Sequence, residues 1–166
     1  MEFGDPLSVT SPSDTQLVIE RAFVAPPHLV YACYTQPNLI RRWLTGPDGW
    51  TMPVCTYDAR QGGTYRFEWR GPEDAFLAVG GTITEIDAPR LIDAQETFDS
   101  GVMGPTYRSE TLFQLEGHGT LLVQTLTYSS MAHRDMVAAT GMADGMEFSF
   151  KGLDRLLKAE QSNLTN

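Results

Sequence analysis

The last segment of this chain is patterned for one long helix, whereas almost everything before it is patterned for strands. From Met131 onward, apolar residues recur at steps of three and four positions: Met136, Ala139, Met142, Met146, Phe150, Leu153 and Leu157. This spacing predicts a long helix with one apolar face that other parts of the chain must cover. Gly141, Gly145 and Gly152 each cost up to about 1 kcal/mol inside a helix, so they indicate either close packing or a local break.

Seven segments ahead of this helix are predicted to be strands: 15–24, 50–57, 65–70, 76–86, 91–98, 107–115 and 121–128. The clearest of them is 65–70, where aromatic residues alternate with charged ones and therefore share one face of a sheet. Two short helices are expected between the first two strands, separated by a break at Gln36-Pro37. Glycine pairs at Gly62-Gly63 and Gly80-Gly81 are interpreted as turn and bulge residues of a curved sheet.

This order of elements assigns the chain to the α+β class. We expect a seven-stranded, curved antiparallel sheet wrapped around a long C-terminal helix, with two short helices after the first strand. A chain of 166 residues and 18.4 kDa has the size of one domain. We place that domain at residues 15–160, between a flexible N-terminal tail at 1–14 and a C-terminal tail at 161–166.

The charge balance limits the partners that the chain can have. A net charge of −9 and a pI near 4.7 repel the phosphate backbone and anionic lipid surfaces, so neither nucleic acid nor a membrane is expected as a partner. The N-terminus lacks the basic start and apolar stretch of a secretory signal, and no apolar run approaches the length of a membrane span. We therefore expect a soluble, cytoplasmic protein.

Cysteine, histidine and short-motif patterns offer no recognisable catalytic set. Cys33 and Cys55 are expected to be free, buried thiols. His28, His118 and His133 have no metal-ligand spacing, so no metal is expected, although His133 would lie at a cavity mouth if the final helix begins there. Motifs for a nucleophilic serine, a nucleotide phosphate or zinc are absent, so catalytic residues stay unknown and no cofactor is expected.

Several motifs spread along the chain point to a known superfamily. They are Arg21, Phe23, Ala25 and Pro26; Thr35, Pro37, Trp43 and Pro47; Asp58 with Gly62-Gly63; Glu85-Ile86 with Pro89-Arg90-Leu91; and Thr140-Gly141-Met142 with Gly145 and Leu153 to Leu157. Their succession, from about Thr15 to Glu160, resembles the START-like (SRPBCC, pollen-allergen-like) superfamily. More narrowly, it resembles the branch named for the C-terminal domain of the activator of the heat-shock chaperone ATPase. The resemblance implies a helix-grip fold with a cavity between sheet and helix.

The residues that would line such a cavity fall into an apolar set and a polar pair. The apolar set is Trp43, Tyr65, Phe67, Trp69, Phe98, Tyr128, Met142 and Met146. Its members either form ordinary core or, taken together, a lining that adapts to an apolar ligand. Glu96 and Gln124 share the inward parity of their strands and would orient a ligand, unless a bulge shifts the register and turns both to solvent.

Three functions compete for this arrangement. The first is binding of a small hydrophobic molecule, lipid-like or aromatic and polyketide-like, which needs no catalytic residue. The alternative is a polyketide cyclase or lyase type of enzyme in which Glu96 or Tyr65 moves a proton, and it predicts a cavity-facing carboxyl with a raised pKa. The second alternative is a chaperone-activator-like interaction domain that docks through its outer sheet face or a loop. A homodimer is a further possibility from the apolar strands.

Overall fold

In a computed structural model, which describes residues 1–165, the chain folds into one antiparallel sheet and four α-helices. The strands are β1 (Ser8–Thr10), β2 (Gln16–Phe23), β3 (Thr51–Tyr57), β4 (Thr64–Arg70), β5 (Phe76–Asp87), β6 (Leu91–Asp99), β7 (Tyr107–Glu116) and β8 (Gly119–Thr127). The helices are α1 (Pro27–Thr35), α2 (Pro37–Trp43), α3 (Met131–Ala138) and α4 (Met142–Leu164), and a 3-10 turn, η1, spans Pro72–Asp74. The predicted α+β class is confirmed.

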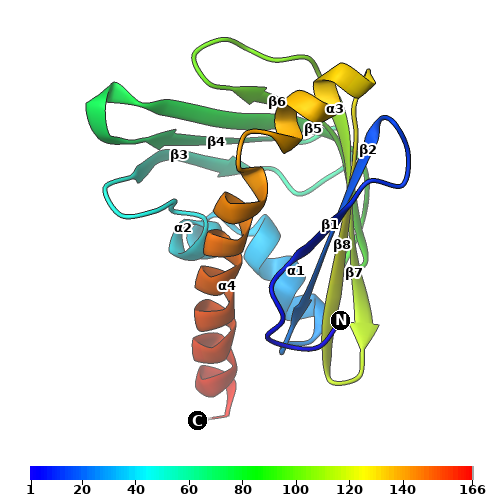
Figure 1. The fold of residues 1–166 in the computed structure, drawn as a ribbon. Helices are drawn as coiled ribbons and strands as arrows, with labels where there is room; N and C mark the ends of the chain where they lie inside the picture. The colour runs from blue at the N-terminus through cyan, green and yellow to red at the C-terminus, as the bar shows by residue number, and fades with distance from the viewer. Residues whose placement is uncertain (166) are drawn as a thin grey trace.

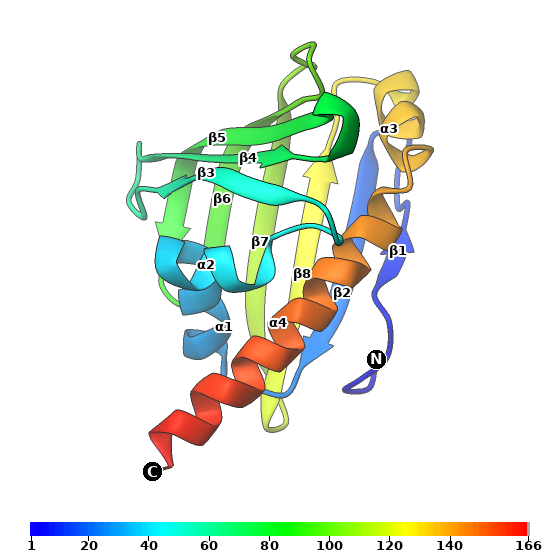
Figure 2. The ribbon, with the colours of Figure 1, turned by 90° about the vertical axis from the view of Figure 1, so that its left-hand side faces the viewer.

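The sheet is strongly bent and holds α4 in its concave side. Its strand order is β1-β2-β8-β7-β6-β5-β4-β3, so α1 and α2 carry the chain from β2 to the opposite edge at β3. Strands β1, β2, β8 and β7 form an upright wall, β3 to β5 fold over its top, and α4 crosses the hollow side (Figures 1 and 2). Register shifts in β3 and β5 mark bulges where the strands bend. This is the predicted helix-grip fold.

The sheet has eight strands, so the predicted number of seven is wrong by one. The additional strand, β1, lies within the segment 1–14 and pairs Val9 with Ile19 of β2. A strand of three residues carries too little pattern to be recognised, and it forms here because the edge of β2 offers free backbone groups. At the other end, α4 continues to Leu164, so most of the segment 161–166 is helical; residue 166 lies outside the described residues.

The long helical segment is divided in two at Gly141. Gly141 has φ 76°, a left-handed conformation that favours glycine, and it separates α3 from α4. Gly152 has a different role, since a Cβ there would lie 3.1 Å from the carbonyl oxygen of Trp43, which allows α4 to approach α2 closely. The break and the close packing that the helix glycines indicated are therefore both present, at different residues.

One part of the interior is a core of buried, mostly aromatic and aliphatic side chains, called here the packed end. It is formed by Phe23, Val30, Cys33, Trp43, Phe113, Leu122, Phe150 and Leu153, which belong to a larger cluster of buried residues that also includes Tyr128. The Phe150 ring meets Phe23 edge-on at 5.4 Å and stacks on Trp43 at 6.4 Å between ring centroids. The indole of Trp43 donates a hydrogen bond to the Cys33 carbonyl at 2.8 Å, so even its polar atom is satisfied inside the protein.

Both cysteines are free and buried, as predicted, and burial raises the pKa of the Cys33 thiol to about 11. An ion pair also anchors α4 to the sheet: Arg21 on β2 is 2% exposed and reaches the partly exposed Asp154 at 2.6 Å. Glu147 lies 3.5 Å from the same guanidinium, and its carboxylate also accepts a hydrogen bond from the Leu7 backbone at 2.8 Å. Among residues 1–165, no helix is both long and apolar enough to cross a membrane.

Candidate functional site

The concave face of β6 changes from buried to open along its length. Ile92 and Ala94 are buried in the core, Glu96 is half-buried, and Phe98 is 40% exposed. All four share one strand face, so Glu96 lies on the concave side and its partial exposure is toward the hollow side of the sheet. Solvent exposure on this face therefore increases toward the end of β6.

Glu96 belongs to one row of residues that crosses the concave face from strand to strand. We call this set the tyrosine row; its members are Tyr57, Tyr65, Gly81, Glu96, Tyr107 and Tyr128. Cα pairing joins Tyr57 to Tyr65, Tyr65 to Gly81, Gly81 to Glu96 and Glu96 to Tyr107. The Tyr107 and Tyr128 rings then approach to 5.2 Å between centroids, which carries the row to the end of β8. Sheet register has placed a carboxyl among four phenols.

Gly81 is the residue that allows Tyr65 to reach Glu96. A Cβ on Gly81 would lie 2.3 Å from Cζ and 2.4 Å from the hydroxyl of Tyr65, so the ring lies directly across this glycine. The Tyr65 hydroxyl thereby donates a hydrogen bond to Oε1 of Glu96, two strands away, at 2.7 Å. The interpretation of Gly80-Gly81 as bulge residues is wrong, because both are paired regularly and the bulge in β5 falls between Ile83 and Glu85. The glycine provides space for an aromatic ring.

The Glu96 carboxyl and its phenols perturb one another. Burial raises the pKa of Glu96, and hydrogen bonds with the Tyr107 and Tyr65 hydroxyls partly lower it. Burial also raises the pKa of Tyr65 and of Tyr107, and the neighbouring Glu96 charge adds to both shifts. The phenols are therefore neutral hydrogen-bond donors at physiological pH, directed at a carboxyl that gives up its proton less readily than usual.

His133, near the start of α3, adds a second polar group next to this row. It is 8% exposed, and its ring meets Tyr128 edge-on at 4.8 Å and Tyr107 at 6.4 Å between centroids. Within residues 1–165, its Nδ1 atom is buried and has no hydrogen-bond partner. A buried polar atom without a partner costs about 1–3 kcal/mol, so a further group that supplied a hydrogen bond here would be stabilising.

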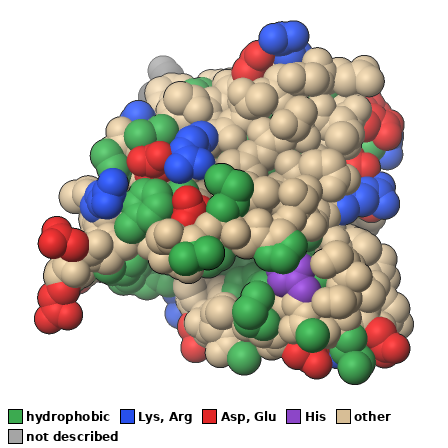
Figure 3. Space-filling model, turned by 90° about the horizontal axis from the view of Figure 1, so that it is seen from above, with side chains coloured by type: hydrophobic (Ala, Val, Ile, Leu, Met, Phe, Trp, Pro, Cys, Tyr) green, Lys and Arg blue, Asp and Glu red, His purple; other side chains and the backbone are tan. Residues whose placement is uncertain are grey.

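The surface around this end of the interior is apolar. Large apolar side chains that are exposed there come from the end of β6, from the loop after it and from α3: Phe98, Val102, Met103, Met131 and Met136. The view from above shows apolar side chains gathered around a histidine in a recess between two parts of the surface (Figure 3). Exposed apolar residues beside a recess are typical of an entrance to a ligand site.

Of the remaining predicted lining residues, some lie near the tyrosine row and one lies in the packed end. Phe67 and Trp69 continue the aromatic stripe of β4, with 6.1 Å between ring centroids, and the Trp69 indole donates to the Leu44 carbonyl at 2.7 Å. Gln124 is half-buried on β8 and donates to the Ser109 hydroxyl at 3.0 Å. Trp43, in contrast, belongs to the packed end.

The two predicted methionines lie on α4. Met142 and Met146 are both half-buried and pack against the apolar core from the helix side. Their thioethers are flexible enough to follow the shape of whatever occupies the adjacent space.

Sequence reasoning missed Tyr57, Tyr107 and Gly81 as members of this site. The strand parity of Tyr107, which shares a face with the buried Ser109 and Thr111, is a signal that could have identified it. The pairing of Tyr107 with Glu96 carries no such signal, because the loop 100–106 sets the register between the two strands.

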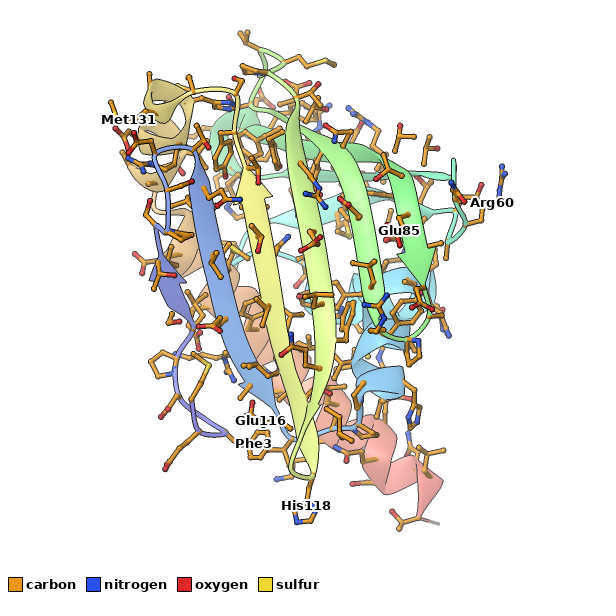
Figure 4. All side chains as sticks on the ribbon, turned by 90° about the vertical axis from the view of Figure 1, so that its right-hand side faces the viewer. Phe3, Arg60, Glu85, Glu116, His118 and Met131 are labelled. Atoms are coloured by element: carbon orange, nitrogen blue, oxygen red, sulfur yellow. The ribbon has the colours of Figure 1, made fainter. Side chains whose placement is uncertain are left out.

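Two surface hollows lie elsewhere on the molecule. One, of about 400 Å³, is lined by Met1, Glu2, Phe3, Glu116 and Gly117. The other, of about 550 Å³, lies between the start of the chain and α4 and includes Phe3, Val24 and Lys158. Figure 4 labels Phe3, Glu116 and His118 together at this lower end and Met131 at the opposite one. Neither hollow is lined by a residue of the tyrosine row, and no group of three or more metal-ligating side chains occurs among residues 1–165.

Comparisons with known proteins place the chain in a family. Residues 24–158 match the family model described as Activator of Hsp90 ATPase homolog 1-like protein. A crystal structure of a protein from Rhodobacter sphaeroides is similar, with 30% identity and a TM-score of 0.86 over 93% of this chain and 99% of that one. A Mycobacterium smegmatis protein has 24% identity and a TM-score of 0.81 over 92% and 97% of the two chains, which supports the fold alone. No curated protein matches the sequence.

Proposed function

This chain belongs to the family of Activator of Hsp90 ATPase homolog 1-like proteins, and we propose that it binds a small hydrophobic molecule bearing a polar group between its sheet and α4. The observation that carries the proposal is the Glu96 carboxyl, half-buried on the concave face and bonded to Tyr65 at 2.7 Å. A ligand there would meet apolar surface on most sides and one polar anchor, which is the usual composition of a small-molecule site.

The apolar part of the binding free energy would come from aromatic rings and methionines. The rings of Tyr57, Tyr65 and Phe67 are stacked on the concave face, with 5.0 Å between the first two centroids. Met142 and Met146 approach from α4. Burial of apolar ligand surface against such groups contributes about 25 cal/mol for each Å² removed from water. The ligand class is therefore lipid-like or aromatic and polyketide-like.

The polar groups argue for a site and against ordinary core packing. A core made only for stability has no use for a carboxyl at position 96, because burial makes its ionisation costly and an apolar side chain of similar size would be more favourable there. The unpartnered Nδ1 of His133 has the same implication. Two such features at one end of the interior support a role in which an added molecule completes the hydrogen bonding.

Native mass spectrometry of the purified protein, followed by denaturing extraction, tests the proposal. The expected result is a bound small molecule, or a melting temperature that rises with the concentration of a lipid or aromatic compound. Met146→Trp, which adds bulk on the core-packed face of α4, should weaken binding, whereas Leu115→Trp at a 71% exposed position near the β7–β8 hairpin, at the opposite end of the molecule, should not. An empty protein that no compound stabilises would overturn the proposal and favour a protein partner.

A second candidate, proton-transfer chemistry on a bound substrate, is favoured by the raised pKa of Glu96. A carboxyl whose pKa is shifted toward neutrality is suited to general acid-base catalysis in a cyclase or lyase type of reaction. The compound recovered by extraction would be incubated with the protein and its conversion followed by mass spectrometry. Conversion that Glu96→Gln abolishes while binding persists would support the enzyme, and a compound that stays unchanged would rule it out.

A further inference from the structure

We propose that the polar group recognised at this site is a protonated amine, held between the Glu96 carboxylate and the faces of the surrounding tyrosine rings. This inference rests on the proposed function and names the chemical class of the ligand. The anchor at the centre of the tyrosine row is an acid, and the groups around it lack the positive charge that would balance it.

The Glu96 carboxylate has no cationic partner within the described chain. Nine ion pairs form among residues 1–165, and none of them includes Glu96. Its hydrogen bonds come from phenols instead, from Tyr65 at 2.7 Å and from Tyr107 within hydrogen-bonding reach. Neutral donors satisfy some of the carboxylate lone pairs but leave its charge unbalanced, and a buried charge is favourable only when it is paired.

The aromatic side chains around the carboxylate also favour binding of a cation. Tyr57 stacks on Tyr65 with 5.0 Å between centroids, and Tyr107 approaches Tyr128 at 5.2 Å, so aromatic rings flank Glu96 on both sides along the row. Aromatic faces attract an ammonium group within about 6 Å of the ring centroid, more strongly when water is excluded. A carboxylate flanked by aromatic rings therefore favours an ammonium over a neutral group of equal size.

His133 supplies a further contact at the edge of the site. Its Nδ1 is buried without a partner, beside the Tyr107 ring whose hydroxyl reaches Glu96. In a neutral imidazole this nitrogen is able to accept a hydrogen bond, so a second donor on the ligand, an N–H or O–H some distance from the amine, would complete it. The site is thus matched to an aromatic or aliphatic amine that carries one additional donor.

The pH dependence of binding follows from the groups that face the carboxyl. These are the phenols of Tyr57 (β3), Tyr65 (β4), Tyr107 (β7) and Tyr128 (just after β8), with His133 (α3) beyond them. Burial raises the pKa of Glu96, so its charged form becomes more populated as the pH rises toward 8. Amine affinity should increase over that range, and a His133→Asn variant should keep the increase if Glu96 is its source.

Matched pairs of probes test the charge directly by isothermal titration calorimetry and thermal shift. Suitable pairs are 1-naphthylmethylamine with 1-naphthalenemethanol, 2-phenylethylamine with 2-phenylethanol, and octylamine with octanol. We expect each well-fitting amine to bind at least about tenfold more tightly than its alcohol at pH 8. Glu96→Gln should remove that preference, whereas Glu116→Gln at the exposed β7–β8 hairpin deletes the same charge far from the site and should preserve it.

The outcomes separate this inference from the proposed function. If alcohols bind as tightly as their amines, or if the preference for amines survives Glu96→Gln, the proposed amine ligand is wrong. The proposed hydrophobic site would still stand. Absence of binding by every probe, together with an empty protein in native mass spectrometry, would overturn both. Tyr65→Phe gives a second variant with an intact ring stack, and it should reduce amine affinity less than Glu96→Gln because the charge remains.

Discussion

The packed end and the tyrosine row are made by the same sheet and helix but have opposite characters. Phe150 at the packed end is 2% exposed and packs against the rings of Phe23 and Trp43, whereas Glu96 in the row is a half-buried carboxyl among phenols. At the packed end even the Trp43 indole has an internal hydrogen bond, while Nδ1 of His133 near the row has none. The difference is the basis for assigning stability to the packed end and, in our proposal, ligand binding to the tyrosine row.

This division explains how a domain without disulfide bonds can stay folded with a carboxyl and an unpartnered imidazole nitrogen in its interior. Close-packed apolar contacts at the packed end contribute most of the favourable free energy of folding. The polar groups of the tyrosine row lower the net stability by part of that amount. Substitutions at the two ends should therefore differ in kind: at the packed end they should lower stability, and in the row they should change binding or the pH dependence of stability.

The largest expected effect is that of Phe150→Ala. Removing this ring leaves a cavity between Phe23 and Trp43 and should lower the free energy of unfolding by about 3–5 kcal/mol. Urea denaturation followed by circular dichroism measures it, with exposed Phe148→Ala as the matched control. A loss below about 1 kcal/mol would show that the packed end is not the main source of stability.

A smaller effect is expected for Gly81→Val in the row. The new side chain would overlap the Tyr65 ring, so we expect a loss of about 1–3 kcal/mol of stability together with loss of the Tyr65–Glu96 hydrogen bond. Tyr65→Ala makes room for the added side chain, so the double variant should be less destabilised than the sum of the single ones. Additive effects in this double-mutant cycle would contradict the proposed role of Gly81.

Glu96→Gln should alter the pH dependence of stability. The pKa of Glu96 is raised in the folded protein, so the folded state holds its proton to a higher pH than the unfolded state, whose pKa is about 4.3. Stability associated with the protonated carboxyl is thus present below pH 4.3 and is lost as the pH rises through the folded-state pKa.

Denaturant unfolding from about pH 4 to pH 8 checks this expectation. The glutamine variant should gain in stability relative to the wild type as the pH rises, since it cannot ionise. A difference between the two proteins that stays constant over this range would show that Glu96 titrates normally.

The smallest effect is expected for Ser130→Ala at the start of α3. The Ser130 hydroxyl accepts a hydrogen bond from the His133 backbone at 3.0 Å and caps the helix, which is typically worth about 1 kcal/mol. Hydrogen exchange should become faster in α3, while amides of the packed end should keep their protection. Ser129→Ala is the control, and equal acceleration throughout the molecule would contradict a local role for α3.

Much of the fold could be predicted because its signals are local. Alternation along 65–70 and the spacing of three and four residues after Met131 each report which side of an element is apolar. The exceptions also have local causes: β1 is too short to show a pattern, and the left-handed Gly141 divides a segment whose apolar period continues through it.

The candidate site was only partly predictable. Strand parity placed Glu96 and Tyr65 among the candidates, and both lie in the tyrosine row. Trp43 has the same apolar character as the other candidates but lies in the packed end, because residue type does not distinguish a dry core from a ligand-lining wall. Tyr107 and Gly81 were missed because their importance comes from the partners that they meet.

By itself, the sequence determined the class of the fold, the apolar face of the C-terminal helix and the inward parity of individual strands, since each depends on residues close together in the chain. Tertiary structure alone decided that Tyr57, Tyr65, Gly81, Glu96 and Tyr107 form one row across five strands. Register between strands depends on loop lengths and bulges, and a shift of one residue would turn each side chain to the opposite face. Whether a carboxyl meets phenols or solvent is therefore a property of the assembled sheet.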